Sequence, residues 1–317
     1  MMTKDAPIVL PDPDTSRDNE VRPFRIGKSL KQEGIRGRAV RLGTVAEQIL
    51  SAHAYPDPVA RILGEALALI GMLGSILKTN GIITLQLKSS GPIPMLVADY
   101  TLDDRGGHLR GYADVDNDKL GQYGKQPSFE GLIGSKKGYF AITIDREEQE
   151  RYQGIVDLRG DSMAAVAETY FQQSEQLPTA LHLSADKDPI SDHWRAGGAM
   201  IQHLSRTEEG QARILDVAGK EEWNRTKILL ETLKTREILD PGLTLDEILF
   251  RLFHEDGVRV FDATRIDRQC RCDRDRLVRV LSTFPPDDIK EMTVKGVITM
   301  NCQFCNKTFE FDPAILS

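Results

Sequence analysis

Apolar and polar residues follow two different periods along the first two thirds of this chain. Residues with strand character occur in four short runs, 82–87, 93–100, 139–144 and 152–158. The last two runs flank a short charged turn, which predicts a hairpin. Helical periodicity and start signals predict helices over 57–77 and 161–176. This mixture predicts the α+β fold class for the larger part of the chain.

Composition changes divide the chain further. Residues 1–24 are expected to form a flexible tail, and 25–204 the α+β core domain. Within the core, Thr44 and Glu47 have the spacing of a capping box at a helix start. The Gly- and Asp-rich segment 103–125 predicts an exposed loop around one short strand.

Residues 205–258 predict a helical linker of low stability. Charges of both signs are dense over 205–240, so we expect a helix there without deep burial. Thr244 and Glu247 form a second capping box, which opens a helix with a single apolar stripe.

Composition and charge exclude several classes of protein. The chain has 317 residues, 40% of them hydrophobic, and a net charge of −7, which indicates a globular protein of more than one domain. Because acidic residues outnumber basic ones, we expect no strong binding to nucleic acid. The most apolar run, 59–77, contains Arg61 and Glu65, and is interrupted too early for a membrane span of about 20 residues. With no signal peptide visible in 1–24, we expect a cytoplasmic protein and no membrane association.

All four cysteines lie near the C-terminus, in two close pairs: Cys270 with Cys272, and Cys302 with Cys305. In a reducing cytoplasm, clustered thiols serve metal binding or redox chemistry. Two such pairs fit a Cys₄ site for one Zn²⁺ ion per chain. The surrounding domain, 259–317, is small enough for the metal to supply much of its folding free energy. Chemistry alone leaves open a closed structural zinc site or one that responds to oxidants.

The Cys-x-Cys and Cys-x-x-Cys pattern resembles the redox switch of the thirty-three-kilodalton heat-shock protein family. The segment Ser174-Glu175-Gln176-Leu177-Pro178-Thr179 is similar to that family too, as are 37–42, 77–86, 151–156 and 249–255. The resemblance implies a redox-regulated, ATP-independent holdase chaperone, not an enzyme. It implies that oxidation forms the disulfides Cys270–Cys272 and Cys302–Cys305, releases zinc and unfolds the linker.

The resemblance also implies partners. These are unfolding client proteins, ATP-driven foldases that act downstream, and a second copy of the chain in an oxidised homodimer. We expect clients to bind apolar linker residues that become exposed on activation. The candidates are Trp223, Leu230, Leu233, Ile248 and Leu252.

Two other functions have some support in the sequence. The first is a zinc-ribbon nucleic-acid binder, suggested by six arginines over 265–279, although interleaved aspartates favour a solvated, charge-compensated face. The second is a thiol oxidoreductase that uses Cys302 and Cys305, although no thioredoxin-like βαβ pattern surrounds them. Zinc and thiol content before and after oxidation would separate these functions from a redox-regulated chaperone.

Overall fold

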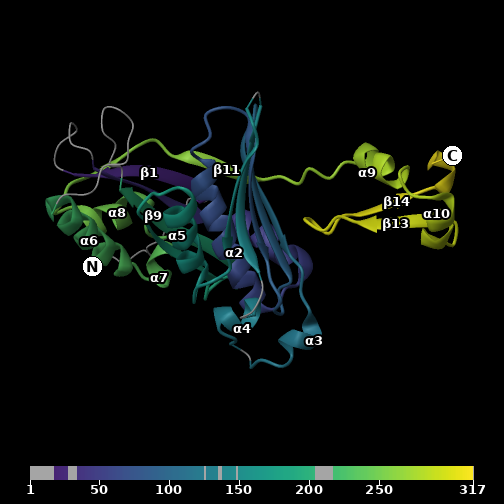
Figure 1. Cartoon of the computed structure of the whole chain (residues 1–317), viewed down its shortest axis with the longest axis horizontal. Helices are drawn as coiled ribbons and strands as arrows, with labels where there is room; N and C mark the ends of the chain where they lie inside the picture. Colours follow the sequence, from purple (N-terminus) through teal and green to yellow (C-terminus); the bar gives the residue numbers. More distant parts are fainter. Residues whose placement is uncertain are drawn as a thin grey trace, which may run out of the picture.

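The computed structural model describes residues 18–27, 34–124, 126–134, 138–147, 149–203 and 217–316. Its strands form one sheet of eleven strands and a separate sheet of three near the C-terminus. Helices cover the large sheet (Figure 1). The expected α+β class is confirmed.

One half of the large sheet is an antiparallel array in the order β7-β6-β3-β4-β5. Its strands are β3 (Gly81–Lys88), β4 (Met95–Asp103), β5 (Gly106–Ala113), β6 (Tyr139–Arg146) and β7 (Tyr152–Asp157). The four predicted strands and the β6–β7 hairpin are confirmed. The one short strand predicted within 103–125 is confirmed as β5, although this strand is mostly buried and not exposed, because it pairs with β4 along its length and the ring of Tyr100 covers Gly107.

The other half is antiparallel in the order β1-β2-β9-β8. Its strands are β1 (Glu20–Ile26), β2 (Ile35–Leu42), β8 (Thr179–Lys187) and β9 (Trp194–His203). The tail predicted over 1–24 is wrong for 20–24, because Val21 and Phe24 of β1 are buried in the sheet. Residues 1–17 lie outside the described residues.

A strand from the C-terminal part of the chain joins the two halves. β11 (Thr264–Arg268) pairs antiparallel with β1 and parallel with β5, and β10 (Val258–Val260) pairs with β1. Ile266 of β11 is buried against the central helix near Gly71. The expected boundary at residue 259 is therefore too early, since both β10 and β11 belong to the core sheet.

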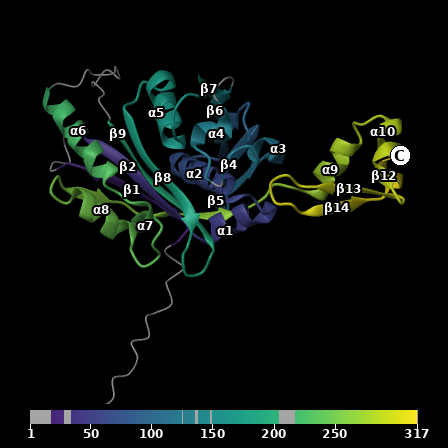
Figure 2. The same ribbon diagram turned by 90° about the horizontal axis from the view of Figure 1, so that it is seen from below.

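The central helix α2 (Asp57–Gly74) contacts β3, β4 and β5 of one half and β2, β8 and β9 of the other (Figure 2). Its apolar residues are buried almost throughout, as expected for a core helix. The other helices of the core are α1 (Thr44–Leu50), η2 (Ser51–His53), α3 (Asn117–Leu120), α4 (Phe129–Ile133) and α5 (Met163–Ser174).

The capping box predicted at Thr44 is wrong. Thr44 is the first residue of α1 and does not cap it. The Asn19 Oδ1 instead accepts hydrogen bonds from the backbone N–H groups of Gly43 and Val45. The Glu47 carboxylate accepts the N–H of Trp194, on β9. Both partners are distant in the sequence, so the local spacing could not reveal them.

The described part of the linker folds onto the outer face of the second half of the sheet, as α6 (Val217–Glu231), α7 (Thr235–Ile238) and α8 (Leu245–Phe253) (Figure 2). The linker residues 205–216 lie outside the described residues. The capping box at Thr244 and Glu247 is confirmed, with both reciprocal bonds present. The expected shallow burial is wrong, because most of the linker's described apolar side chains face the sheet, although Ile228 and Phe250 are exposed. A shared apolar cluster contains Phe24, Ile35, Ala39, Ala180, Ala199 and Ile201 from the sheet, and Leu230, Leu233, Ile238, Leu245, Ile248, Leu249, Leu252 and Phe253 from the linker.

Beyond β11, the chain forms a small unit that lies to one side of the large sheet in both views (Figures 1 and 2). Its elements are α9 (Arg274–Leu281), α10 (Pro286–Met292), β12 (Thr293–Val294), β13 (Val297–Asn301), β14 (Thr308–Phe311) and η3 (Pro313–Leu316). Its buried core contains Leu281, Ile298, Phe309 and Phe311. Within the described ranges, no helix of the protein is long and apolar enough to cross a membrane.

Candidate metal centre

Two separate turns supply the four cysteines of the candidate centre. Cys270 and Cys272 lie between β11 and α9, where the Gln269 N–H donates to the carbonyl of Leu109 on β5. Cys302 and Cys305 lie in the turn between β13 and β14. This turn is closed by bonds from Asn306 N–H to the Cys302 carbonyl and from Cys302 N–H to the Lys307 carbonyl. Asn306 adopts the left-handed conformation (φ 57°) that such a turn requires.

The four sulfur atoms converge. All Sγ atoms lie within 4.8 Å of one another, as four ligands of one metal ion must. The two sulfur contacts of 3.5 Å run across the pairs, from Cys270 to Cys302 and from Cys272 to Cys305. The candidate ligands predicted from the sequence are thus brought together, and their chemistry fits zinc.

The surroundings affect these thiols differently. Burial raises the pKa of Cys270 and of Cys272. Burial would also raise the pKa of Cys302, but hydrogen bonds from the N–H groups of Cys305 and Phe304 outweigh it and lower that pKa. Backbone donors directed at one sulfur favour its thiolate form, which is the form that binds a metal.

The first cysteine pair is tied to the core by Arg271. Its guanidinium donates to the Asp99 carboxylate of β4 at 2.8 Å, and Asp99 also accepts from Arg110 of β5 at 2.6 Å. The Asp99 side chain is only 3% exposed, so this ion pair is largely shielded from solvent. Arg271 was among the arginines expected on a solvated face, and that expectation is wrong for this residue. Its partner lies far away in the sequence, with no local signal.

The second pair contacts the core through Phe304, the aromatic residue inside the Cys-x-x-Cys turn. Its ring lies 3.8 Å from the Arg110 guanidinium carbon and packs edge-on against Tyr112, with centroids 5.0 Å apart. The side chain of Asn306 donates to the carbonyl of Ala52 at 3.1 Å. Both cysteine turns therefore touch the core beside β4 and β5, and sequence analysis missed these contacts. The only available signal was an aromatic residue in a turn that is usually polar.

The candidate client-binding residues lie away from the cysteines, on the side of the linker that packs against the sheet. Leu230, Leu233, Ile248 and Leu252 are buried in the cluster between linker and sheet, and Trp223 is half-buried at its edge. They form one continuous apolar surface with the outer face of the sheet. No described client-binding candidate lies near the cysteines.

Comparison with known proteins agrees with this architecture. A family model described as "Hsp33 protein" matches residues 26–312. A 33 kDa chaperonin of Caulobacter vibrioides is 35% identical over 309 residues, which cover 95% of this chain and 97% of that protein. A 33 kDa chaperonin of Escherichia coli is 34% identical over 279 residues, covering 88% of each.

The fold has a counterpart among solved structures. The crystal structure of a 33 kDa chaperonin, an Hsp33 homologue from Thermotoga maritima, aligns with a TM-score of 0.73 at 23% identity. The alignment covers 93% of this chain and 96% of that one. The likeness therefore extends over the core sheet and the C-terminal unit together.

Proposed function

This chain belongs to the Hsp33 family of chaperones, and from this premise we propose that it is a redox-regulated, ATP-independent holdase. Its activity as a chaperone implies that it binds unfolding client proteins. The observation that carries the redox proposal is the convergence of four thiols, within 4.8 Å, in a unit with a very small apolar core. Such a unit depends on a metal for its stability, and thiol ligands lose the metal when they are oxidised.

In the reduced protein, Cys270, Cys272, Cys302 and Cys305 would hold one Zn²⁺ ion. When bound, the ion supplies a charge that stabilises four thiolates and crosslinks two turns separated by about thirty residues. The backbone donors at Cys302 favour the ligating form of that thiol. The resulting unit presents Arg271 and Phe304 to the core.

Oxidation would then release the metal. Each disulfide forms when two thiols lose two protons and two electrons to an oxidant such as peroxide, which is reduced to water. The resemblance to the family supports Cys270–Cys272 and Cys302–Cys305 as the pairs. The reduced arrangement does not itself select them, since the 3.5 Å contacts link Cys270 with Cys302 and Cys272 with Cys305. Peptide mapping of the oxidised protein decides between the two patterns.

Loss of the metal would reach the linker through the core. We infer that residues 205–258 act as the metastable linker and that the switch unit begins after β11. Once that unit unfolds, Arg271 and Phe304 leave β4 and β5, and β11 loses the anchor on its C-terminal side. Because β11 and β10 pair with β1, whose Phe24 lies under α8, the disturbance reaches the linker directly. Release of the linker would expose apolar surface for clients.

The remaining parts of the proposal concern partners and location. The holdase would pass clients to ATP-driven foldases and form a homodimer when oxidised, in the cytoplasm. Client contacts would use Trp223, Leu230, Leu233, Ile248 and Leu252. Their burial together in one cluster supports this assignment, since they would become exposed together.

The test is light scattering of a thermally unfolding client protein. Reduced, zinc-loaded protein is expected to leave aggregation unchanged, whereas protein treated with peroxide and heat suppresses it near equimolar ratio. Zinc and free thiols are counted in both samples. Equal suppression by both forms would contradict redox regulation, and no suppression by either would contradict the holdase itself.

A further inference from the structure

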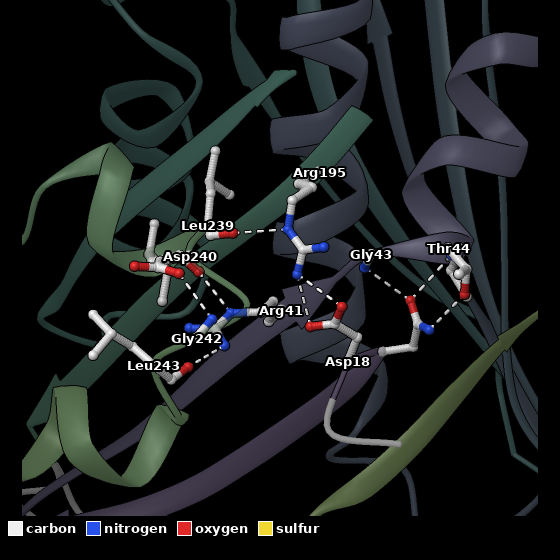
Figure 3. A network of polar contacts seen from close by, with 12 residues as sticks. Asp18, Arg41, Gly43, Thr44, Arg195, Leu239, Asp240, Gly242 and Leu243 are labelled. Carbon is white, nitrogen blue, oxygen red and sulfur yellow. Dashed lines mark hydrogen bonds and ion pairs between the residues drawn. The ribbon is translucent and has the colours of Figure 1, made fainter. Parts of the chain in front are cut away.

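Two arginines of the core hold the linker at its central turn (Figure 3). Arg41 lies on β2 and Arg195 on the neighbouring strand β9. The Arg41 Nε donates to the Ile238 carbonyl at 2.9 Å, and its Nη1 donates to the Leu243 carbonyl. The Arg195 Nε donates to the Leu239 carbonyl at 2.7 Å. Three carbonyls around the α7–α8 turn are thus bound by two guanidinium groups from the sheet.

These bonds satisfy groups that the linker cannot satisfy by itself. Ile238 is the last residue of α7 and Leu239 is its C-cap. No later turn of that helix therefore supplies an N–H group to donate to their carbonyl oxygens. Cations are favoured at a helix C-terminus. Donation from a charged group to a carbonyl in a poorly hydrated site is stronger than a neutral bond.

Arg41 is the unusual member of the pair, because it is only 1% exposed. Burial lowers its pKa to about 10, and the neighbouring Arg195 adds to this effect, whereas the acids Asp18, Asp240 and Glu20 oppose it. Arg195 is fixed in turn by Asp18, whose two carboxylate oxygens lie 2.7 and 2.8 Å from its Nη2. An arginine this deeply buried is stable only while its acceptors remain in place.

The backbone of β9 also fits this turn closely. Gly197 lies opposite Arg41 in the register of β2 and β9. A Cβ atom added at Gly197 would lie 3.1 Å from a side-chain carbon of Ile238 and 3.3 Å from its carbonyl oxygen. The same Cβ would lie 3.1 Å from the Val40 carbonyl oxygen on β2, so an alanine at position 197 fits only if Ile238 or the strand backbone shifts by a few tenths of an ångström.

We propose that Arg41 and Arg195, with the gap at Gly197, position the linker turn and determine how readily the linker leaves the core at a given metal content. This proposal rests on the proposed function for its consequence, namely that linker release permits client binding. The described hydrogen bonds of Arg41 and Arg195 and the nearest neighbours of Gly197 include no cysteine, so substitutions at these positions leave the candidate metal ligands in place. Weakening these contacts should therefore release the linker while zinc remains bound.

The experiment uses the full chain in its reduced, zinc-loaded state. Arg195→Met, Arg41→Met and Gly197→Ala are compared with Arg61→Met, at an arginine that pairs with Asp186 on the core surface and has no hydrogen bond or ion pair to the described part of the linker. Hydrogen exchange of amides 219–256 is followed by mass spectrometry, with zinc and thiols counted. We expect exchange to rise about tenfold or more in the two arginine variants, consistent with the loss of a charge-assisted hydrogen bond, and to rise in Gly197→Ala because the added methyl group displaces Ile238. Zinc should stay at the wild-type level, and Arg61→Met should match wild type.

Two further comparisons make the outcome decisive. Arg195→Lys, which can still reach one acceptor, should fall between Arg195→Met and wild type. If Arg41→Met also loses protection in β3 to β6, that substitution has damaged the core and its linker exchange is not used. The proposal is then judged on Gly197→Ala and Arg195→Met. Wild-type linker exchange in these two variants, with zinc retained, would overturn the proposal. An oxidised wild-type protein that binds no client would instead overturn the proposed function and leave the exchange result valid.

Discussion

Arg271 lies between two candidate metal ligands, Cys270 and Cys272, yet it bonds to the core. Its bond to Asp99 at 2.8 Å makes the position of the first cysteine pair depend on β4. The residue between these cysteines is not a spacer, because it carries the contact through which the small unit docks. Phe304 has the same function in the second pair.

We therefore expect Arg271→Met to weaken docking without removing zinc. Asp99 would keep its ion pair with Arg110, and Arg271 is partly exposed to solvent. The substitution should therefore weaken the interaction between the C-terminal unit and the core by only about 1 kcal/mol. Activation by peroxide should then begin at a lower temperature, as measured by client light scattering. Arg279→Met, on the exposed side of α9, is the control and should behave as wild type. Unchanged activation temperature in Arg271→Met would refute the docking role.

Cys302→Ser tests the metal centre itself. A serine hydroxyl is a poor zinc ligand, so bound zinc should fall from one ion per chain to near zero, and the C-terminal unit should lose its structure. Metal analysis and near-ultraviolet circular dichroism measure the two effects. Gln303→Ser, at the exposed neighbouring position, should keep the ion. One ion per chain in Cys302→Ser would contradict a four-cysteine site.

Glu65 predicts a pH dependence of the core. Burial in α2 raises the pKa of Glu65 from 4.5 to about 8. Between these values the folded protein holds a proton that the unfolded chain has released, so the free energy of unfolding falls as pH rises through this window. Glu65→Gln should remove this contribution to the fall in the free energy of unfolding, which denaturant titrations at pH 5 and pH 8 measure. A decline as steep as in wild type would show that Glu65 does not titrate in this range.

At the scale of the element, the linker helices combine a mainly polar outer face with a largely buried inner one. Their dense charges led us to expect little burial, but most of the apolar positions of α6, α7 and α8 pack against the sheet, with Ile228 and Phe250 as exposed exceptions. Periodicity correctly predicted which residues form the stripe, including Ile248 and Leu252. It could not predict what covers the stripe, because the covering strands lie far away in the sequence.

The same limit applies to other elements. The capping box at Thr244 was predictable because both partners lie within one helical turn, whereas Asn19 caps α1 across a long separation. The strand β11 has no strong local pattern, and its place is determined by pairing with β1 and β5. For the metal centre, cysteine spacing was sufficient to predict all four candidate ligands.

Leu252→Ala tests the dual role of the linker stripe. Leu252 is 4% exposed, and its truncation should destabilise linker packing by about 2–5 kcal/mol. In the reduced protein, faster proteolysis of the linker is expected. In the oxidised protein, weaker suppression of client aggregation is expected, because a contact surface has been lost. Phe250→Ala, at a position 64% exposed on the same helix, should change neither the proteolysis rate in the reduced state nor the packing. Equal proteolysis of Leu252→Ala and wild type would contradict the packing role.

At the scale of the whole molecule, three parts are joined in series. The C-terminal unit holds the cysteines, β11 connects it to both halves of the sheet, and the outer face of one half carries the linker (Figures 1 and 2). The expected division of the chain placed β10 and β11 in the switch domain. Their position in the core sheet gives a change at the cysteines a short route to the linker.

The measurement that tests this account most directly is hydrogen exchange of the full chain before and after oxidation with peroxide and heat. We predict that amides 270–311 and 219–256 lose protection together, at the same rate as zinc release, while β3, β4 and β6 stay protected. Retained protection over 219–256 after the zinc has left would contradict the coupling between metal centre and linker on which the account depends.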